Sequence, residues 1–225
     1  MEDKSLISAD ALWKNPNTSL AFEYIRKFKY PWDILSHIGD IINEIASGLD
    51  MNEYNCHDGN VWIAKDASIA DTATIKGPCI IGKGTDIRPG AFIRGNVIVG
   101  ENAVIGNSTE LKNCFLFDSV QVPHFNYVGD SILGYKSHLG AGAVTSNVKS
   151  DKSLVTIRIF DERIETGRKK LGAILGDYVE IGCNSVLNPG TVIGECSNVY
   201  PLSSVRGYIP KNVIYKSEGV IVKKL

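Results

Sequence analysis

The stretch IGKGTDIRPGAFIRGNVIVGENAVIGNSTEL, residues 81–111, places an aliphatic residue at every sixth position. The same step continues on both sides of this stretch and returns near the C-terminus. Its apolar positions are Ile63, Ile69, Ile75, Ile81, Ile87, Ile93, Val99, Ile105, Leu111 and Phe117, and then Leu175, Ile181, Leu187, Ile193, Val199 and Val205. The fourth residue after most of them is small or β-branched, as at Thr85, Ala91 and Val97. A period of six fits neither a helix nor an ordinary alternating strand.

This repeat predicts a coil with three flat sides, in which each group of six residues forms one short strand and one corner. The aliphatic residue points inward and the small residue fits the tight bend. Glycines near the corners, as in Gly82 and Gly84, supply backbone conformations that other residues avoid. Coils stacked in this way bury one another's apolar rows, as in other solenoids. We therefore expect an all-β prism of parallel strands.

Composition places the chain among soluble globular proteins. Its 225 residues are 44% hydrophobic and 22% charged, and the net charge is −1. This balance gives no reason to expect nucleic acid or an anionic membrane as a partner. The first residues, MEDKSLIS, lack the apolar region of a signal peptide, and no run reaches the roughly 18 apolar residues of a membrane span. A cytoplasmic protein is expected.

The cysteines are odd in number and scattered. They are Cys56, Cys79, Cys114, Cys183 and Cys196, and no two form a C-x-x-C pair. This spacing argues against a disulfide framework and against a structural zinc site. We expect reduced packing residues.

Two segments do not follow the repeat. Residues 1–55 form a predicted helical module, in which PWDILSHIGDIINEIASG, residues 31–48, has the apolar spacing of one amphipathic helix. Its aromatic residues Trp13, Phe22, Phe28 and Trp32 are expected to dock onto the prism or a neighbour.

The second segment, VTIRIFDERIETGRKK, residues 155–170, alternates apolar residues around a turn at Asp161-Glu162, which predicts a hairpin extruded from the prism at about 150–170. The prism itself spans 56–210, and a basic tail, 211–225, follows.

Several short motifs occur in order on the repeat. They are Arg88-Pro-Gly-Ala91, Gly106–Lys112, His124–Asp130, Gly140-Ala141-Gly142 with Asn147, and ETGRKKLGAILGD, residues 165–177. Together they resemble the hexapeptide-repeat acyltransferases. Within that family they are most similar to the acetyltransferase domain of bifunctional glucosamine-1-phosphate acetyltransferase/UDP-N-acetylglucosamine pyrophosphorylase, in the archaeal variant with an inserted hairpin. Nothing before residue 60 resembles the nucleotide loop of the other half.

The resemblance implies a left-handed parallel β-helix, a homotrimer, and acetyl-CoA or another short acyl-CoA as co-substrate, with no metal. It assigns His124 as the general base, a role that suits a histidine because its pKa lies near neutrality. The other implied contacts fall into three groups. The sugar phosphate is held by Arg88, Lys112 and Lys170, the acceptor pocket by Tyr127, His138 and Asn147, and acyl-CoA by Cys183, Tyr200, Pro201 and Arg206. A backbone N–H of Gly140, Ala141 or Gly142 is the candidate donor to the oxyanion.

The sequence departs from that family at two places. His138 stands where the family has an asparagine, and Tyr200-Pro201-Leu202 is bulkier than the family's wall near the acyl donor. Two other functions stay open. The first is a prism that binds a sugar phosphate or sugar nucleotide without catalysis. The second is a zinc enzyme like the gamma-class carbonic anhydrases, for which His57, His124 and His138 are the available histidines.

Overall fold

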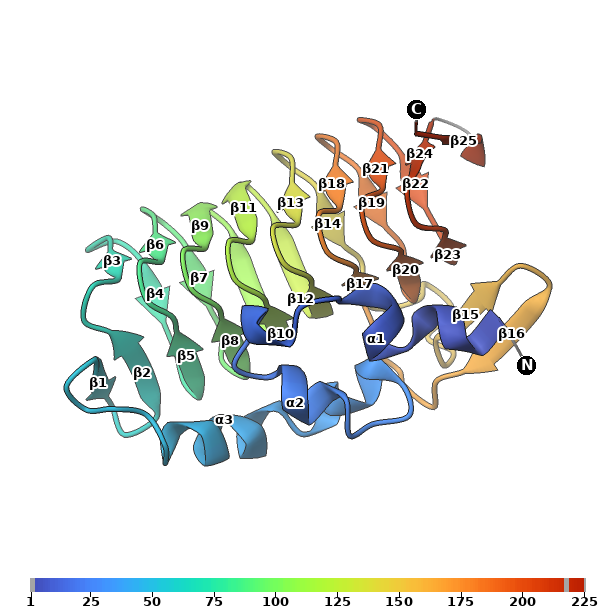
Figure 1. The fold of residues 1–225 in the computed structure, drawn as a ribbon. Coiled ribbons are helices and arrows are strands. Elements are labelled where there is room, and N and C mark those ends of the chain that lie inside the picture. The colour runs from blue at the N-terminus through green and yellow to red at the C-terminus, as the bar shows by residue number, and fades with distance from the viewer. Residues whose placement is uncertain (1–2, 217–218, 225) are drawn as a thin grey trace.

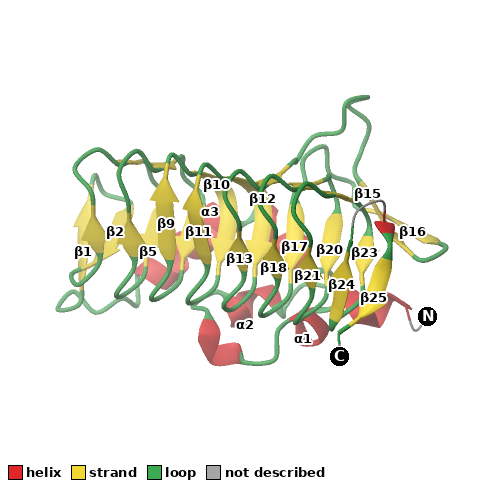
Figure 2. Ribbon diagram, turned by 90° about the horizontal axis from the view of Figure 1, so that it is seen from above, coloured by secondary structure: helices red, strands yellow, loops and turns green. Residues whose placement is uncertain are grey.

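The computed structural model describes residues 3–216 and 219–224, and these form a left-handed parallel β-helix of stacked three-sided coils (Figure 1). The predicted fold class is confirmed. The coils are the predicted prism, an N-terminal module of short helices lies along one side, and a hairpin projects near the C-terminal end (Figures 1 and 2).

The three sides of the coil are named here face 1, face 2 and face 3, in the order in which the chain passes them. Face 1 contains β2 (Val61–Ala64), β5 (Cys79–Ile81), β8 (Val97–Val99), β17 (Ala173–Leu175), β20 (Thr191–Ile193) and β23 (Tyr208–Ile209). Face 2 contains β3 (Ser68–Ile69), β6 (Asp86–Ile87), β9 (Val104–Asn107), β11 (Gln121–His124), β13 (His138–Leu139), β18 (Glu180–Ile181), β21 (Asn198–Val199) and β24 (Val213–Tyr215). Face 3 contains β4 (Thr74–Ile75), β7 (Phe92–Ile93), β14 (Val144–Thr145), β19 (Val186–Leu187) and β22 (Ser204–Val205).

Two longer strands, β10 (Glu110–Leu116) and β12 (Tyr127–Leu133), run from face 3 around the corner onto face 1. Antiparallel pairing occurs only at the additions to the prism, within the described residues. There β1 (Tyr54–His57) pairs with β2, β25 (Ile221–Lys223) pairs with β24, and the two strands of the hairpin pair with each other.

The predicted inward row is buried along most of the prism. Ile81, Ile93 and Leu111 are completely buried, and so are Leu175 and Val205 further along. The first coil differs, because Ile63, Ile69 and Ile75 keep partial exposure. That coil has a neighbouring coil on one side only, so half of its cover is missing.

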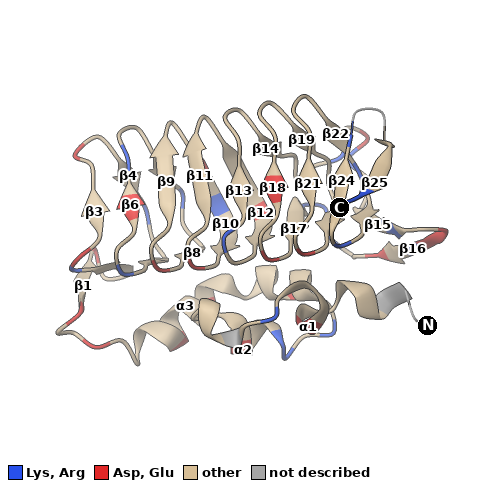
Figure 3. Ribbon diagram, turned by 45° about the horizontal axis from the view of Figure 1, so that its top comes forward, with Lys and Arg blue, Asp and Glu red and all other residues tan. Residues whose placement is uncertain are grey.

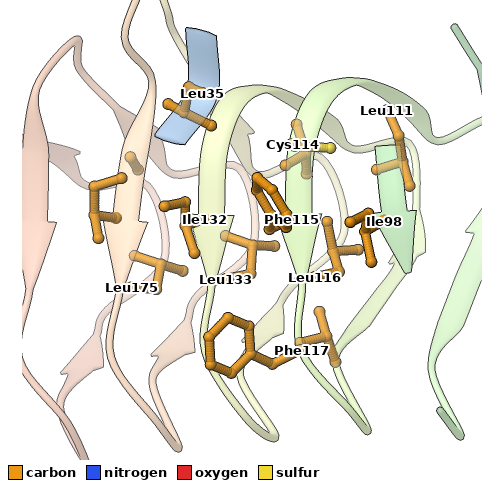
Figure 4. Close-up of a cluster of buried hydrophobic side chains, with 14 of the residues drawn as sticks. Leu35, Ile98, Leu111, Cys114, Phe115, Leu116, Phe117, Ile132, Leu133 and Leu175 are labelled. Carbon is orange, nitrogen blue, oxygen red and sulfur yellow. The ribbon is translucent and has the colours of Figure 1, made fainter. Parts of the chain in front are cut away.

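The sequence-based assignment of Phe117 to the inward row is wrong. Val99 pairs with Leu116 in the next coil, so the inward row steps five residues from Leu111 to Leu116. Leu116, Leu133 and Leu175 form one row across neighbouring strands (Figure 4). Because side chains alternate along a strand, a shift of one residue turns Phe117 outward.

The shift comes from the corner itself. β10 continues through it with Asn113 at φ 50°, and β12 does the same with Asp130 at φ 49°. Asparagine and aspartate tolerate this left-handed backbone better than most residues. Each of these corners therefore uses one residue fewer than the regular repeat.

The outward side chains of face 1 are apolar, which explains why the helices lie there. Ile80, Ile98, Phe115, Ile132, Ile174 and Val192 occupy one register across the face and are at most 1% exposed. The covering elements are the 3-10 helices Asp3–Ile7, Pro16–Thr18 and Pro31–Ser36 with α1 (Ala9–Leu12), α2 (Phe22–Ile25) and α3 (Ile38–Ala46). The module and the prism share one hydrophobic core.

The aromatic residues of the module dock onto this chain's own prism. Trp13, Phe22 and Trp32 are at most 2% exposed. The Trp13 ring lies 5.1 Å from that of Phe117, and its Nε1 donates to the Leu175 carbonyl at 2.9 Å. The outward Phe117 is thus completely buried beneath the module.

The single helix expected over 31–48 is wrong in one respect. The chain forms a 3-10 helix to Ser36 and an α-helix from Ile38, with His37 at φ −118° between them. The His37 N–H closes the first segment by donating to the Ile34 carbonyl. The apolar positions still face the prism, since Ile34, Leu35, Ile38 and Ile42 are buried.

The predicted hairpin is confirmed as β15 (Thr156–Ile159) and β16 (Glu162–Glu165). Its side chains Ile157, Ile159 and Ile164 are buried against the C-terminal coils. The boundaries proposed at 55 and 210 stay predictions. Of the tail, residues 217, 218 and 225 lie outside the described residues. No helix in the described part of the chain is long and apolar enough to cross a membrane.

Candidate active site

His124 lies at the edge where face 2 turns into face 3, named here the 2–3 edge. It ends β11, is exposed, and stands beside Asn107 of the preceding coil. The backbone holds it firmly. Its N–H donates to Asn126 Oδ1 at 3.1 Å, and its carbonyl accepts from the Gly142 N–H at 3.0 Å.

Asn126 is a residue that the sequence reasoning missed. It is 3% exposed, and its Nδ2 donates to the carbonyls of Gly140 (2.9 Å) and Ala143 (3.0 Å). It thereby ties the His124 backbone to the glycine corner of the next coil. The signal in the sequence was its position, four residues after the inward Val122, where the repeat otherwise places a small or β-branched residue.

The glycine corner offers one free backbone donor. The Gly140 N–H donates to the Ile181 carbonyl and the Gly142 N–H to His124. Within the described residues, the Ala141 N–H has no acceptor. Of the three residues predicted to stabilise an oxyanion, Ala141 is therefore the one whose donor is available.

The 2–3 edge continues through residues predicted to hold the acyl donor. Ala141 is followed one coil later by Cys183, since the Asn184 N–H donates to the Ala141 carbonyl. Pro201 follows in the coil after that, beside Gly182, and Tyr200 is 46% exposed. His124, Ala141, Cys183 and Pro201 thus form a column along one edge. Arg206 does not belong to it, because it follows β22 on face 3.

Face 3 carries most of the predicted acceptor residues. Lys112 and Tyr127 lie on the adjacent strands β10 and β12, where Glu110 pairs with Tyr127 and Lys112 with Gly129. Lys170 is exposed and precedes Leu171, whose N–H donates to the Asn147 carbonyl at 3.0 Å. These residues are brought to one region of the prism.

Arg88 is not brought to Lys112. It follows β6 on face 2 and its Nε donates to Asp86 at 2.8 Å. The cation that stands one coil before Lys112 is Arg94, whose N–H donates to the Leu111 carbonyl and whose guanidinium pairs with Glu110 at 2.7 Å. Arg94 was not predicted. It occupies the position six residues after Arg88, one side of the coil further on.

A buried carboxylate organises the corner between face 3 and face 1, named here the 3–1 edge. Asp130 is 4% exposed and accepts from Asn113 Nδ2 at 2.8 Å and Asn147 Nδ2 at 2.5 Å. Asn147 Nδ2 also donates to the Tyr127 hydroxyl at 3.1 Å. Burial raises the pKa of Tyr127 above its usual value, so the phenol stays neutral. With its oxygen accepting from Asn147, its O–H remains available to a ligand.

Arg168 connects this corner to the N-terminal module. Its guanidinium donates to Ser36 Oγ at 2.5 Å. Burial lowers the pKa of Arg168, and the nearby charges of Asp130 and Asp33 offset part of that effect. The predicted cation of this segment was Lys170, which is exposed. The hairpin base therefore supplies Arg168 as a positive charge near Asp130.

Asp130→Asn is expected to lower the free energy of unfolding by about 1–3 kcal/mol. The carboxylate now accepts a hydrogen bond from the side-chain NH₂ of Asn113 and another from that of Asn147. The amide of the variant has only one oxygen, so its own NH₂ group would face one of these two NH₂ groups. A buried donor would then have no acceptor. Urea unfolding followed by circular dichroism measures the change. Asp151→Asn, whose side chain is 63% exposed, is the matched control and should change stability far less. Equal stabilities of the two variants would contradict this account of Asp130.

His138 lies on face 2, apart from His124. It pairs with Gln121, three residues before His124, and its Nδ1 lies 2.9 Å from Glu180 Oε2. A hollow of about 480 Å³ opens here, lined by Gln121, Lys136, His138, Tyr178 and Glu180 among others. Among the residues described, no three His, Cys, Asp or Glu side chains converge as a metal site would require.

Comparisons with known proteins agree with the resemblance. A family model described as the GMPPB C-terminal domain matches residues 75–195. The bifunctional protein GlmU of Methanococcus maripaludis is 34% identical over 204 residues, which cover 89% of this chain and 49% of that protein. A bifunctional sugar-1-phosphate nucleotidylyltransferase/acetyltransferase of Sulfurisphaera tokodaii is 38% identical over 171 residues, covering 68% and 42%.

The chain thus spans about half the length of these curated relatives. Among solved structures, a hexapeptide transferase family protein from Anaplasma phagocytophilum superposes with a TM-score of 0.42 at 19% identity, covering 78% of this chain and 86% of that one.

Proposed function

The chain belongs to the GMPPB C-terminal domain family of hexapeptide-repeat β-helices, and from this premise we propose that it transfers an acyl group from acyl-CoA to the amine of an amino-sugar phosphate. The observation that carries the proposal is the 2–3 edge. Successive coils there carry His124, the free N–H of Ala141, Cys183 and Pro201. Acetyl-CoA is the proposed donor and glucosamine-1-phosphate the first acceptor to test.

The proposed reaction needs no covalent enzyme intermediate. The amine nitrogen attacks the thioester carbonyl carbon while the His124 imidazole accepts the proton that the nitrogen loses. The Ala141 N–H donates to the oxyanion that forms. When the carbon–sulfur bond breaks, the proton passes from His124 to the sulfur, so the products are an amide and free thiol. Holding both substrates side by side supplies much of the remaining acceleration.

The acceptor phosphate is proposed to bind Lys112, with Arg94 and Lys170 as the other candidate cations of the same prism. Arg88 lies on face 2, so it would contact this phosphate only from an adjoining prism. A dianion gains most from charge-assisted hydrogen bonds, and Lys112 forms no ion pair with another described residue. Tyr127 and Asn147 would contact the sugar. His138, beside the hollow on face 2, would line the acceptor pocket of an adjoining prism.

We propose a homotrimer on the basis of the same geometry. The N-terminal module covers face 1, whereas the 2–3 edge is exposed and offers only one wall to two substrates. A neighbouring prism would provide the second wall. Light scattering at micromolar concentration should therefore give about three times the chain mass of 24.5 kDa. A monomeric mass would contradict the shared site.

The decisive experiment is a thiol-release assay with acetyl-CoA against a panel of amino-sugar phosphates. Release that depends on the acceptor supports acyl transfer. Saturable binding of a sugar phosphate or sugar nucleotide without thiol release supports the non-catalytic alternative instead, which would retain Lys112 and tolerate the loss of His124.

A further inference from the structure

A groove lined by positive side chains lies between the hairpin and the C-terminal coils. It is named here the basic groove and is defined by Lys149, Arg158, Arg163 and Arg206, which line a hollow of about 250 Å³ with Thr156, Pro189 and Gly207. Among the described residues, no carboxylate lines that hollow. A second hollow of about 200 Å³ shares Lys149, Pro189 and Arg206, and its one acidic residue among those described is Asp151, whose carboxylate lies 3.6 Å from Lys149 Nζ.

The groove has rigid walls. Gly190 and Gly207 have φ of 79° and 77°, and a Cβ on either would come within 3.0 Å of the hairpin, meeting Val155 and the Arg158 carbonyl respectively. The hairpin backbone therefore packs directly on the coil corners. Its apolar residues are buried on one side, so its position is fixed by packing.

Two arginines of the groove stand opposite each other. Arg158 and Arg163 are cross-strand partners in the register of β15 and β16. Like charges in this arrangement destabilise a strand pair. Among the described residues neither forms an ion pair, and both are exposed. An anion bound between them would remove this repulsion.

A third cation is held in place at the same site. Arg206 donates to Asn188 Oδ1 at 3.0 Å, and Asn188 Nδ2 in turn donates to Ser204 Oγ at 3.0 Å and the Val205 carbonyl at 2.8 Å. The guanidinium is thus oriented by an amide that the coil itself fixes. Because the whole chain has a net charge of −1, four cations in one hollow are a local accumulation.

We propose that the basic groove binds the diphosphate group of a ligand. Three guanidinium groups and an ammonium group match the two adjacent phosphates of such a group, since arginine contacts phosphate oxygens in a bidentate manner. The groove lies on face 3 and the 3–1 edge, away from the His124 column. The proposal therefore does not depend on acyl transfer. The same chemistry occurs in free pyrophosphate, in nucleoside diphosphates with their sugar conjugates, and in coenzyme A.

Isothermal titration calorimetry of the full chain with pyrophosphate at physiological salt tests the proposal. Saturable binding is expected, and Arg163→Gln and Arg206→Gln should each weaken it at least tenfold. Arg26→Gln changes an exposed arginine of the N-terminal module that is paired with Asp10 and lines neither hollow, so it should leave binding unchanged. Titrations with UDP and with coenzyme A then identify the carrier, because the compound that binds more tightly than pyrophosphate contributes contacts beyond the diphosphate.

Thermal unfolding gives an independent readout. Pyrophosphate should raise the melting temperature of the unmodified chain. Arg163→Gln should raise it without any ligand, because the cross-strand repulsion is gone, and should reduce the further rise with pyrophosphate. His124→Ala should bind pyrophosphate normally even if it transfers no acyl group. Absence of saturable pyrophosphate binding, or equal binding by the two groove variants and the Arg26→Gln control, would overturn the proposal.

Discussion

His124→Ala is expected to lower the turnover number for acyl transfer by about 10²–10⁴-fold, the usual loss when a positioned general base is removed. The imidazole is exposed at the 2–3 edge, next to the free Ala141 N–H, where an amine and a thioester would meet. The alanine variant keeps the backbone contacts to Asn126 and Gly142. Binding of the sugar phosphate should therefore persist. Steady-state kinetics of thiol release, with calorimetry for acceptor binding, separates the two effects.

His138→Asn is the matched control for that experiment. His138 belongs to face 2, where it contacts Glu180, and the substitution introduces the residue found in the resembling family. This variant should retain activity and change only the choice of acceptor. If His124→Ala turned over the best acceptor as fast as the unmodified chain, the assignment of the base would be wrong. Loss of stoichiometric zinc only when both histidines are replaced would point to the metalloenzyme instead.

Phe117→Ala is expected to destabilise the protein by about 3–5 kcal/mol, in the range for an aromatic residue removed from a core. The ring is completely buried and contacts Trp13 at 5.1 Å and Phe22 at 6.3 Å between centroids, so its loss leaves a cavity beneath the N-terminal module. Trp13 and Trp32 are both buried in this module. Chemical unfolding monitored by tryptophan fluorescence should therefore report the loss directly.

Phe125→Ala provides the comparison, because Phe125 is also a phenylalanine of the prism but is 62% exposed. It should change stability by about 0.5 kcal/mol. A Phe117→Ala variant as stable as this control would mean that the module does not depend on the outward phenylalanine.

The periodic part of the fold was predictable because a single rule, one inward residue in six, repeats over many coils. If the inward residue of one coil is assigned wrongly, the six-residue spacing in the coils before and after it reveals the error. The rule failed at Phe117 because the corner at Asn113 has one residue fewer than the others, which makes Leu116 the inward residue. Both candidate positions, 116 and 117, hold an apolar residue. Leu116 and Phe117 both satisfy an apolar pattern, so only the strand pairing distinguishes them.

The candidate site was predictable only where it coincided with a motif. The column from His124 to Pro201 lies on one edge because the repeat spaces its members by whole coils. Arg94, Asn126 and Arg168 were missed for different reasons. Arg94 and Arg88 occupy equivalent positions on neighbouring sides of a coil. Because Arg88 belongs to a recognisable motif, it was assigned to the sugar phosphate in place of Arg94. Asn126 and Arg168 act through contacts with residues distant in sequence, such as Gly140 and Ser36.

The N-terminal module also has a consequence for how the chain acquires its structure. Trp13 bonds to Leu175 and Lys14 to Asp177, contacts that span more than 160 residues. During synthesis the amphipathic segments emerge first, but the coils that they cover do not exist until most of the chain has been made. Contacts between such distant residues slow folding and leave apolar surface exposed meanwhile. The helical module is thus made before the coils but is among the last parts of this chain to reach its final contacts.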